Sequence, residues 1–383
     1  MALDARNLTR LRRRLHALAE PSGREEATAA FIAEQLTTCG PDLLLTELGG
    51  HGVLAMFAGT ESGPSVMLRA ELDALPLPET LDIDHASFTP GISHKCGHDG
   101  HMAMLLGVAD MLGRRRPDGG RILLLFQPAE ETGAGAAAVL ADDRFAGLHP
   151  DWIFAPHNLP GYAPGTVVTA PGTFCAASTG LDVTLTGRSS HAAYPEQGLS
   201  PDRALAELVL ELVNLPDHLP HEDHLALVTV VHGRLGRPAF GIAPAQAEIL
   251  ATLRADRDEI LDRLQTAAEK AVIRISDAYG LQHEIVWPEP FPAVINDSRA
   301  VALVARTARE LGLDCTAPAE SPFRWSEDFG RLADLGRGAM LGLGSGQDTP
   351  GLHAEDYDFP DAILPGAVAL LHALCLAPSM APL

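Results

Sequence analysis

The sequence predicts an α/β protein: an open mixed sheet with helices on both faces, interrupted by a smaller α+β domain. The first third of the chain alternates short apolar strands with helices, an order typical of an open α/β sheet. The middle follows the order strand, helix, strand, strand, helix, which is typical of a small sheet with helices on one face. The first pattern returns after Pro288-Glu289-Pro290. We therefore expect a discontinuous larger domain at 1–174 and 287–383, and an inserted domain at 175–286.

The chain begins with two predicted helices, because apolar residues recur at helical spacing from Leu8 to Leu36 on both sides of Pro21-Ser22-Gly23. We expect the second helix to begin with Ser22 as its cap and with Glu25 and Glu26 in its first turn. Apolar runs and helical periodicity predict the other elements of the larger domain: strands at 53–57, 65–70, 121–126 and 340–343, and helices at 102–111, 298–311 and 363–376.

The inserted domain shows two kinds of periodicity. Alternating polar and apolar residues predict a first strand, and amphipathic spacing predicts two helices. The expected order is a strand at 181–186, a helix at 201–215, strands at 225–231 and 248–254, and a long helix at 258–279.

Composition and charge exclude several classes of protein. The hydrophobic fraction of 46% and the charged fraction of 20% are typical of a soluble globular chain, and 28 Lys and Arg against 50 Asp and Glu give a net charge of −22. Such a charge argues against nucleic acid or a membrane surface as partner. No apolar run is long enough to span a membrane, and no signal-peptide pattern opens the chain, so we expect a cytoplasmic protein. Five widely spaced cysteines argue against a disulfide framework.

The densest polar cluster is His94-Lys95-Cys96-Gly97-His98-Asp99-Gly100-His101, in a loop before a predicted helix. A thiolate and an imidazole separated by one flexible glycine can bind a divalent transition metal. A capped surface loop is the alternative interpretation of the same residues.

Three further segments carry metal-binding side chains. Glu130-Glu131 follows an apolar strand, at the sheet edge where open α/β folds bind ligands. His157 follows a strand-like segment, and His353 lies in a loop near the C-terminus. Taken separately, the glutamates fit solvated loop residues and the histidines fit structural residues as well as they fit metal ligands. Together with Cys96 and His98 they supply five ligands, enough for two metal ions, and leave one glutamate free as a base.

Taken in order, these segments resemble a known family: the metallopeptidase-type amidohydrolases that include hippurate hydrolases, aminoacylase-like carboxypeptidases and plant auxin-conjugate amidohydrolases. The resemblance covers nearly the whole chain. It rests on the segments 15–16, 20–23, 69–76, 96–101, 127–131, 187–195, 326–329 and 352–353.

The resemblance implies a role for individual residues. Two divalent ions (Zn²⁺, Mn²⁺ or Co²⁺) per subunit would be held by Cys96, His98, Glu131, His157 and His353. Glu130 would be the general base, and His191 would stabilise the oxyanion, often across a homodimer formed through the inserted domains. Asp73 and Asp99 would orient metal ligands.

The sequence departs from the family at one position. An Asn that helps to hold the substrate carboxylate in relatives is replaced by Gly241 in Phe240-Gly241-Ile242-Ala243-Pro244, although Arg254 is present as a further substrate contact. A missing amide removes a hydrogen bond to the substrate and leaves the hydrolytic groups intact.

We therefore predict a metal-dependent amidohydrolase acting on N-acyl amino acids or similar small amides. A dipeptidase or exopeptidase with the same two metals is the alternative within enzymes. A metal-bound protein without activity is disfavoured by the presence of Glu130 and His191. A thiol hydrolase using Cys96 and His98 is disfavoured by their close spacing and by the glutamate pair.

Overall fold

A computed structural model describes residues 4–218 and 224–380, which form two compact units. The larger unit comprises the described residues of Met1–Phe174, Val294–Ser321 and Glu327–Leu383, and the smaller unit comprises those of Cys175–Ala293 and Pro322–Ser326. The second boundary thus lies between Ala293 and Val294, rather than between 286 and 287.

An eight-stranded mixed sheet in the order β1-β2-β4-β3-β5-β16-β6-β15 forms the centre of the larger unit. Its neighbours β4, β3, β5 and β16 are parallel, so their carboxyl ends meet at one edge, where ligands bind in open α/β sheets. The strands are β1 (Leu43–Leu48), β2 (Gly52–Ala58), β3 (Glu61–Glu71), β4 (Gly119–Gln127), β5 (Trp152–Pro160), β6 (Val167–Val168), β15 (Cys315–Thr316) and β16 (Arg337–Gly346). A further short pair joins β7 (Gly172–Cys175) to β14 (Val294–Asn296).

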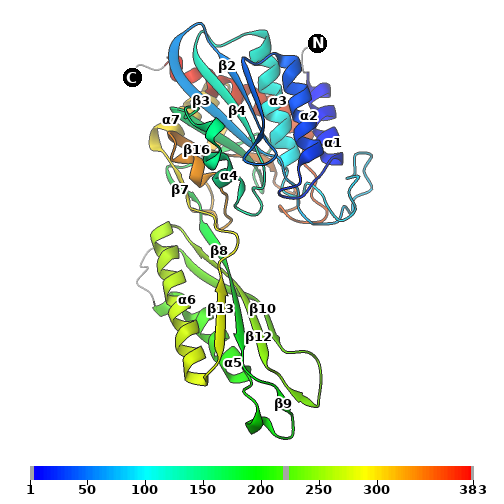
Figure 1. The fold of residues 1–383 in the computed structure, drawn as a ribbon. Helices are drawn as coiled ribbons and strands as arrows, with labels where there is room; N and C mark the ends of the chain where they lie inside the picture. Colours follow the sequence, from blue (N-terminus) through cyan, green and yellow to red (C-terminus); the bar gives the residue numbers. More distant parts are fainter. Residues whose placement is uncertain (1–3, 219–223, 381–383) are drawn as a thin grey trace. The chain divides into compact units, whose positions relative to one another are not determined.

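Helices pack against this sheet in two groups. Five of them share one hydrophobic cluster with alternate strand residues, and Figure 1 shows the first three side by side along the sheet: α1 (Ala5–Ala17), α2 (Glu26–Cys39), α3 (His98–Arg114), α7 (Ser298–Glu310) and α9 (Leu364–Leu376). The short helices α4 (Gly135–Ala141) and α8 (Gly330–Ala333) contact each other and the strands β4, β5 and β16, and their buried side chains lie outside that cluster. The larger unit therefore has the predicted helix–sheet–helix arrangement.

The smaller unit is built on a four-stranded antiparallel sheet, in the order β10-β12-β8-β13. The helices α5 (Asp202–Asn214) and α6 (Asp258–Tyr279) share its hydrophobic cluster and cover it (Figure 1). The strands are β8 (Ala177–Thr186), β10 (Ala226–Leu235), β12 (Gln246–Ala255) and β13 (Gln282–Val286), and a separate pair joins β9 (Ser190–His191) to β11 (Ile242–Ala243). The strand β13 is absent from the sequence prediction because its residues are mostly polar and exposed.

The start of α2 differs from the prediction. Its cap position is Glu25, and the Glu20 carboxylate accepts hydrogen bonds from the backbone N–H groups of Ala27 and Thr28. The Ser22 hydroxyl donates to Asp73 instead. A carboxylate that satisfies two free N–H groups at a helix start makes a serine cap unnecessary.

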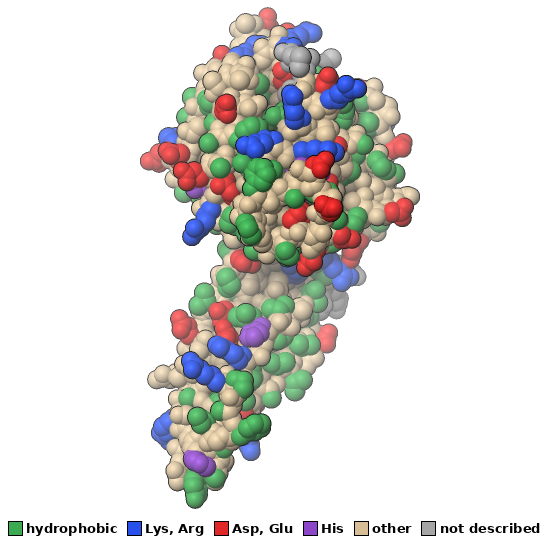
Figure 2. Space-filling model, turned by 90° about the vertical axis from the view of Figure 1, so that its right-hand side faces the viewer, with side chains coloured by type: hydrophobic (Ala, Val, Ile, Leu, Met, Phe, Trp, Pro, Cys, Tyr) green, Lys and Arg blue, Asp and Glu red, His purple; other side chains and the backbone are tan. Residues whose placement is uncertain are grey.

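The distribution of acidic side chains on the surface is consistent with the net charge of −22. Acidic side chains are spread over the visible face of the molecule and do not gather in one patch (Figure 2). Among the described residues, no helix combines the length and apolar character that crossing a membrane requires.

Candidate metal centre

The turn Cys96-Gly97-His98 lies at the carboxyl edge of the sheet and leads directly into α3. Gly97 has a φ of 89°, and a Cβ at this position would lie 2.6 Å from the Asn158 side chain, so the turn requires glycine. The turn brings Cys96 and His98 together inside the protein, where both are buried. The predicted role of Gly97 in allowing a sharp turn therefore has a direct structural basis.

Hydrogen bonding fixes the orientation of His98. Its Nδ1 lies 2.9 Å from the carbonyl oxygen of Asp73 and so must carry a proton, while Nε2 is buried without a hydrogen-bond partner in the described part of the chain. Burial lowers the pKa of His98, but the Asp73 carboxylate and the charges of Glu71 and Glu131 outweigh burial and raise it to about 10. The surroundings thus attract positive charge to Nε2, which either a proton or a metal ion can supply.

Asp73 also positions the glutamate pair. Its Oδ2 accepts hydrogen bonds from the Ser22 hydroxyl at 2.7 Å and from the Glu131 backbone N–H at 2.9 Å. The Glu25 carboxylate accepts from the N–H of Ala129, which has a left-handed φ of 49° between β4 and the glutamates. One buried aspartate therefore contacts the backbone of one predicted ligand and lies beside the ring of another, as expected for a residue that orients metal ligands.

The predicted ligand atoms converge in two groups that share Cys96. One group contains Cys96, His98 and His157, and the other contains Cys96, Glu131 and His353; within each, the ligand atoms lie within 4.8 Å of one another. Cys96 Sγ is 3.7 Å from His157 Nε2, His353 Nε2 is 3.7 Å from Glu131 Oε1, and His98 Nε2 is 3.9 Å from Glu131 Oε1. The structure thus brings all five predicted ligands together.

The electrostatics of these groups favour a bound cation. Burial and the neighbouring carboxylates raise the pKa of Glu130 and of the Cys96 thiol well above their ordinary values, and burial raises the pKa of Glu131 to about 7. Glu131 Oε1, like His98 Nε2, is buried without a hydrogen-bond partner among the described residues. A thiolate, imidazoles and a carboxylate with unsatisfied atoms are the donor set that Zn²⁺, Mn²⁺ or Co²⁺ accept, so the residues fit a divalent metal.

Glu130 lies beside the predicted ligands. Its Oε2 is 3.9 Å from His98 Nε2, and its side chain is 6% exposed. On its other side it meets Glu327 and Asp328, with ligand atoms of all three within 4.8 Å. This position leaves Glu130 next to the predicted ligands, and neither ligand group requires it.

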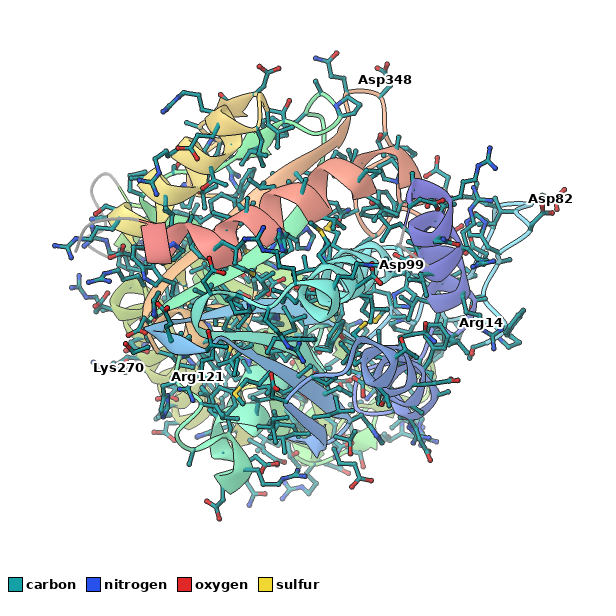
Figure 3. All side chains as sticks on the ribbon, turned by 90° about the horizontal axis from the view of Figure 1, so that it is seen from above. Arg14, Asp82, Asp99, Arg121, Lys270 and Asp348 are labelled. Atoms are coloured by element: carbon teal, nitrogen blue, oxygen red, sulfur yellow. The ribbon has the colours of Figure 1, made fainter. Side chains whose placement is uncertain are left out.

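Asp99 has different partners from Asp73. It accepts hydrogen bonds from Arg12 and His16 of α1 and from the Gly100 N–H, and none of these residues is a predicted ligand. Figure 3 shows Asp99 in the interior, in contrast to Arg14, Asp82 and Asp348 at the rim. Asp99 therefore contacts none of the predicted ligands through its side chain.

His191 and Arg254 belong to the smaller unit. His191 lies in β9, paired with Ile242 of β11, and its exposed ring accepts a hydrogen bond at Nδ1 from the Ala193 N–H. Arg254 lies in β12, where its guanidinium donates to the Arg324 carbonyl and to the Ser326 hydroxyl, and burial lowers its pKa. A neutral His191 carries its proton on Nε2, which makes that atom a hydrogen-bond donor.

A buried acidic cluster beside the glutamates has no role in the sequence prediction. Arg69 pairs with Glu71, Glu327 and Asp328, all of them buried, and Gln127 hydrogen-bonds both Arg69 and Asp328. Glu71 could have been found from the sequence, because it lies at the carboxyl end of an apolar strand, as the glutamate pair lies after β4. Glu327 and Asp328 lie in the segment 326–329 of the family resemblance, but periodicity and spacing assign them no role.

Comparison with known proteins identifies the family of this chain. A model of peptidase family M20/M25/M40 matches residues 67–376. The chain is 34% identical over 345 residues to an N-acetyl-L-cysteine deacetylase of Bacillus subtilis, covering 90% of this chain and 81% of that protein. It is 29% identical to a hippurate hydrolase of Campylobacter jejuni, covering 96% and 95%.

A solved structure from Bacillus subtilis, described as a dinuclear metal-binding peptidase of the M20 family, superimposes with a TM-score of 0.81 at 27% identity over 98% of both chains. The match of the family model extends over most of the chain and includes the turn of Cys96, the glutamate pair and His353. The chain therefore belongs to peptidase family M20/M25/M40 and is a hydrolase of amide bonds.

Proposed function

We propose that the protein hydrolyses the amide bond of N-acyl amino acids, using two divalent ions held by Cys96, His98, Glu131, His157 and His353. The observation that carries this proposal is the convergence of the five ligand atoms in two groups, with Glu130 adjacent to them. The relatives named above are an N-acetyl amino acid deacetylase and a hippurate hydrolase, which supports an acylated amino acid as substrate. Zn²⁺, Mn²⁺ and Co²⁺ all suit this donor set.

The reaction follows from the chemistry of these side chains. When bound, the divalent ions lower the pKa of water and polarise the substrate carbonyl. Glu130 accepts a proton from the attacking water, whose oxygen forms a bond to the carbonyl carbon. Glu130 then delivers this proton to the nitrogen of the amide as the carbon–nitrogen bond breaks, which gives a carboxylic acid and a free amino acid. The raised pKa of Glu130 suits a group that must both accept and donate a proton.

The smaller unit contributes His191 in this proposal. Its Nε2 would donate a hydrogen bond to the negatively charged oxygen that develops on the substrate carbonyl. The hydrogen bond from the Ala193 N–H to Nδ1 supports this role, because a ring that accepts at Nδ1 carries its proton on Nε2.

Dimerisation and location form part of the proposal. The strand β10 is an edge of the four-stranded sheet, and its Val231 and Leu235 are 61% and 40% exposed. Such an edge can pair with a second copy, which supports a homodimer formed through the smaller units. We also propose a cytoplasmic location, which the free thiols of all five cysteines support.

The test of the proposed function is a substrate screen. N-acetyl and N-benzoyl amino acids, dipeptides and unacylated amino acid amides are offered to the metal-depleted protein with Zn²⁺, Mn²⁺ or Co²⁺ added singly. We expect hydrolysis of the N-acyl amino acids only with metal present, and its loss on adding a chelator. Cys96→Ser replaces a soft thiolate with a poor ligand, so metal content and activity should fall together.

Three results would contradict the proposal. Faster hydrolysis of dipeptides would identify a dipeptidase with the same metals. Activity that survives the chelator but not a thiol reagent would identify Cys96 as a nucleophile. Full metal occupancy and activity in Cys96→Ser would remove Cys96 from the ligands.

Gly241 offers a test of substrate recognition. Its carbonyl accepts a hydrogen bond from the Ala192 N–H, next to His191, and no described atom lies within 4 Å of the place where its Cβ would be. We expect Gly241→Asn to lower KM about three- to tenfold for N-acyl amino acids, because an amide can add one hydrogen bond to the substrate carboxylate. KM for the corresponding substrates with a blocked carboxylate should not change.

Gly366→Asn is the matched control, because Gly366 lies in α9, outside the proposed site and dimer edge, and also has no described atom within 4 Å of its Cβ position. An equal effect of both variants, or of Gly241→Asn on blocked substrates, would disprove a specific contact at 241.

A further inference from the structure

Lys95 directly precedes the turn of Cys96, and the proposed function assigns it no role. It is one of only two lysines among the 28 Lys and Arg of the chain, and it is 0% exposed. A fully buried lysine is rare and needs compensating partners. Since Lys95 directly precedes Cys96, its partners decide where this predicted ligand lies.

Lys95 connects two ligand-bearing segments. Its carbonyl oxygen accepts a hydrogen bond of 2.8 Å from the N–H of His353, and its Nζ donates at 2.9 Å to the carbonyl oxygen of Tyr357. His353 has a left-handed φ of 65°, a conformation that a residue other than glycine keeps only when its neighbours hold it. The backbone and the side chain of one residue thus hold both ends of the segment from His353 to Tyr357 beside Cys96.

A chain of hydrogen bonds extends from the same ammonium group to the other side of the turn. Lys95 Nζ donates to Glu79 Oε1, and His16 bridges Glu79 Oε2 and Asp99 Oδ2, each at 2.8 Å. Asp99 follows His98, so the chain Lys95–Glu79–His16–Asp99 links the residue before Cys96 to the residue after His98. Lys95, His16 and Asp99 are fully buried, and the Glu79 side chain is only 9% exposed.

We propose that Lys95 is a positioning residue of the metal centre, which holds the turn of Cys96 and His98 in register with His353 through Glu79 and the backbone of Tyr357. This inference rests on the proposed dinuclear site and adds a residue that binds neither metal nor substrate. The compact ammonium suits the task, because its three donors can point in different directions, whereas a guanidinium is planar and larger.

Replacing the ammonium has a predictable effect on metal binding. Lys95→Met keeps an unbranched apolar stem but removes the donor to Glu79 Oε1 and to the Tyr357 carbonyl. We expect Zn²⁺ affinity, measured by competition with a chromophoric chelator, to fall about 10- to 100-fold, the range found when groups that orient ligands are removed. The stoichiometry of bound Zn²⁺ after dialysis should fall in parallel.

A second variant covers the case in which Lys95→Met does not fold. Glu79→Gln keeps the shape of the side chain and removes the charge that pairs with Lys95, so a smaller loss of Zn²⁺ affinity is expected. The loss of Zn²⁺ affinity in the double variant should be smaller than the product of the fold-losses in the two single variants, because the two residues act through one contact.

The matched control is Asn296→Ala in the larger unit. Asn296 is 3% exposed, and its amide hydrogen-bonds the backbone of Ala170 and Met340. This variant should lower the melting temperature of the metal-free protein but leave Zn²⁺ affinity at the wild-type value. The comparison separates a general loss of stability from a specific loss of ligand positioning.

The possible results distinguish this inference from the proposed function. If Lys95→Met has a lower melting temperature but wild-type Zn²⁺ affinity, Lys95 only stabilises the fold and the inference is wrong. If Asn296→Ala loses as much affinity as Lys95→Met, the effect is not specific and the inference is equally wrong. If the wild-type protein binds none of Zn²⁺, Mn²⁺ and Co²⁺, the proposed metal centre fails and the inference fails with it.

Discussion

Glu130→Gln is expected to lower kcat by about 10²- to 10⁴-fold and to leave the metal content at the wild-type value. Glutamine has the size of glutamate and keeps its hydrogen-bonding capacity, but it cannot accept the proton of the attacking water. In the structure Glu130 lies beside His98 while the two groups of predicted ligands are complete without it. The measurement is kcat together with bound metal by elemental analysis, at matched metal concentrations.

Glu131→Gln is the natural counterpart, because it makes the same chemical change one residue away. It replaces an anionic ligand with a neutral one, so metal affinity should fall and added metal should restore part of the activity. If Glu130→Gln loses its metals while Glu131→Gln keeps them, the roles of the two glutamates are reversed. If Glu130→Gln retains substantial turnover, another group accepts the proton.

His191→Ala is expected to lower kcat by about 10²- to 10³-fold without changing metal content, because it removes one donor to the developing oxyanion. The exposed His283 of β13, in the same unit, provides the matched control, and His283→Ala should have wild-type kinetics. The measurements are kcat, KM and bound metal for the three proteins.

A mixing experiment tests whether His191 acts in the second subunit of a homodimer. Subunits of His191→Ala and Glu130→Gln, mixed and allowed to exchange, should regain activity, since half of the hybrid sites combine an intact Glu130 with an intact His191. Failure to regain activity in verified hybrids would place both residues in the same subunit. An unchanged kcat in His191→Ala alone would show that this histidine has no part in the reaction.

The fold could be predicted wherever the pattern is local. Helix α6 has the predicted bounds 258–279, because 22 residues keep one amphipathic period and Gly280 ends the helix in a left-handed conformation. The short polar strand β13 has no such period, and its place depends on pairing with β8. His157 lies within β5 rather than after it, because the strand continues to Pro160.

The candidate site, like the fold, could be predicted where its residues are close in sequence. Cys96 and His98 are close in sequence, so their chemistry is visible in one segment. The hydrogen bond from the Glu131 N–H to Asp73 joins residues 58 positions apart, and the pairing of Arg69 with Asp328 spans 259 positions. Contacts of this kind depend on the sheet topology and leave no periodic signal, so the partners of Glu71, Glu327 and Lys95 emerge only from the structure.

The scarcity of lysine has a practical consequence for labelling this protein. Lys270 is exposed on α6, whereas the amine of Lys95 is enclosed beside Cys96 (Figure 3 labels Lys270). An amine-selective reagent can therefore modify the side chain of Lys270 in the folded protein but reaches that of Lys95 only when the turn opens. The rate at which a second lysine becomes modified then measures the local opening of the metal-binding turn, read from one peptide by mass spectrometry.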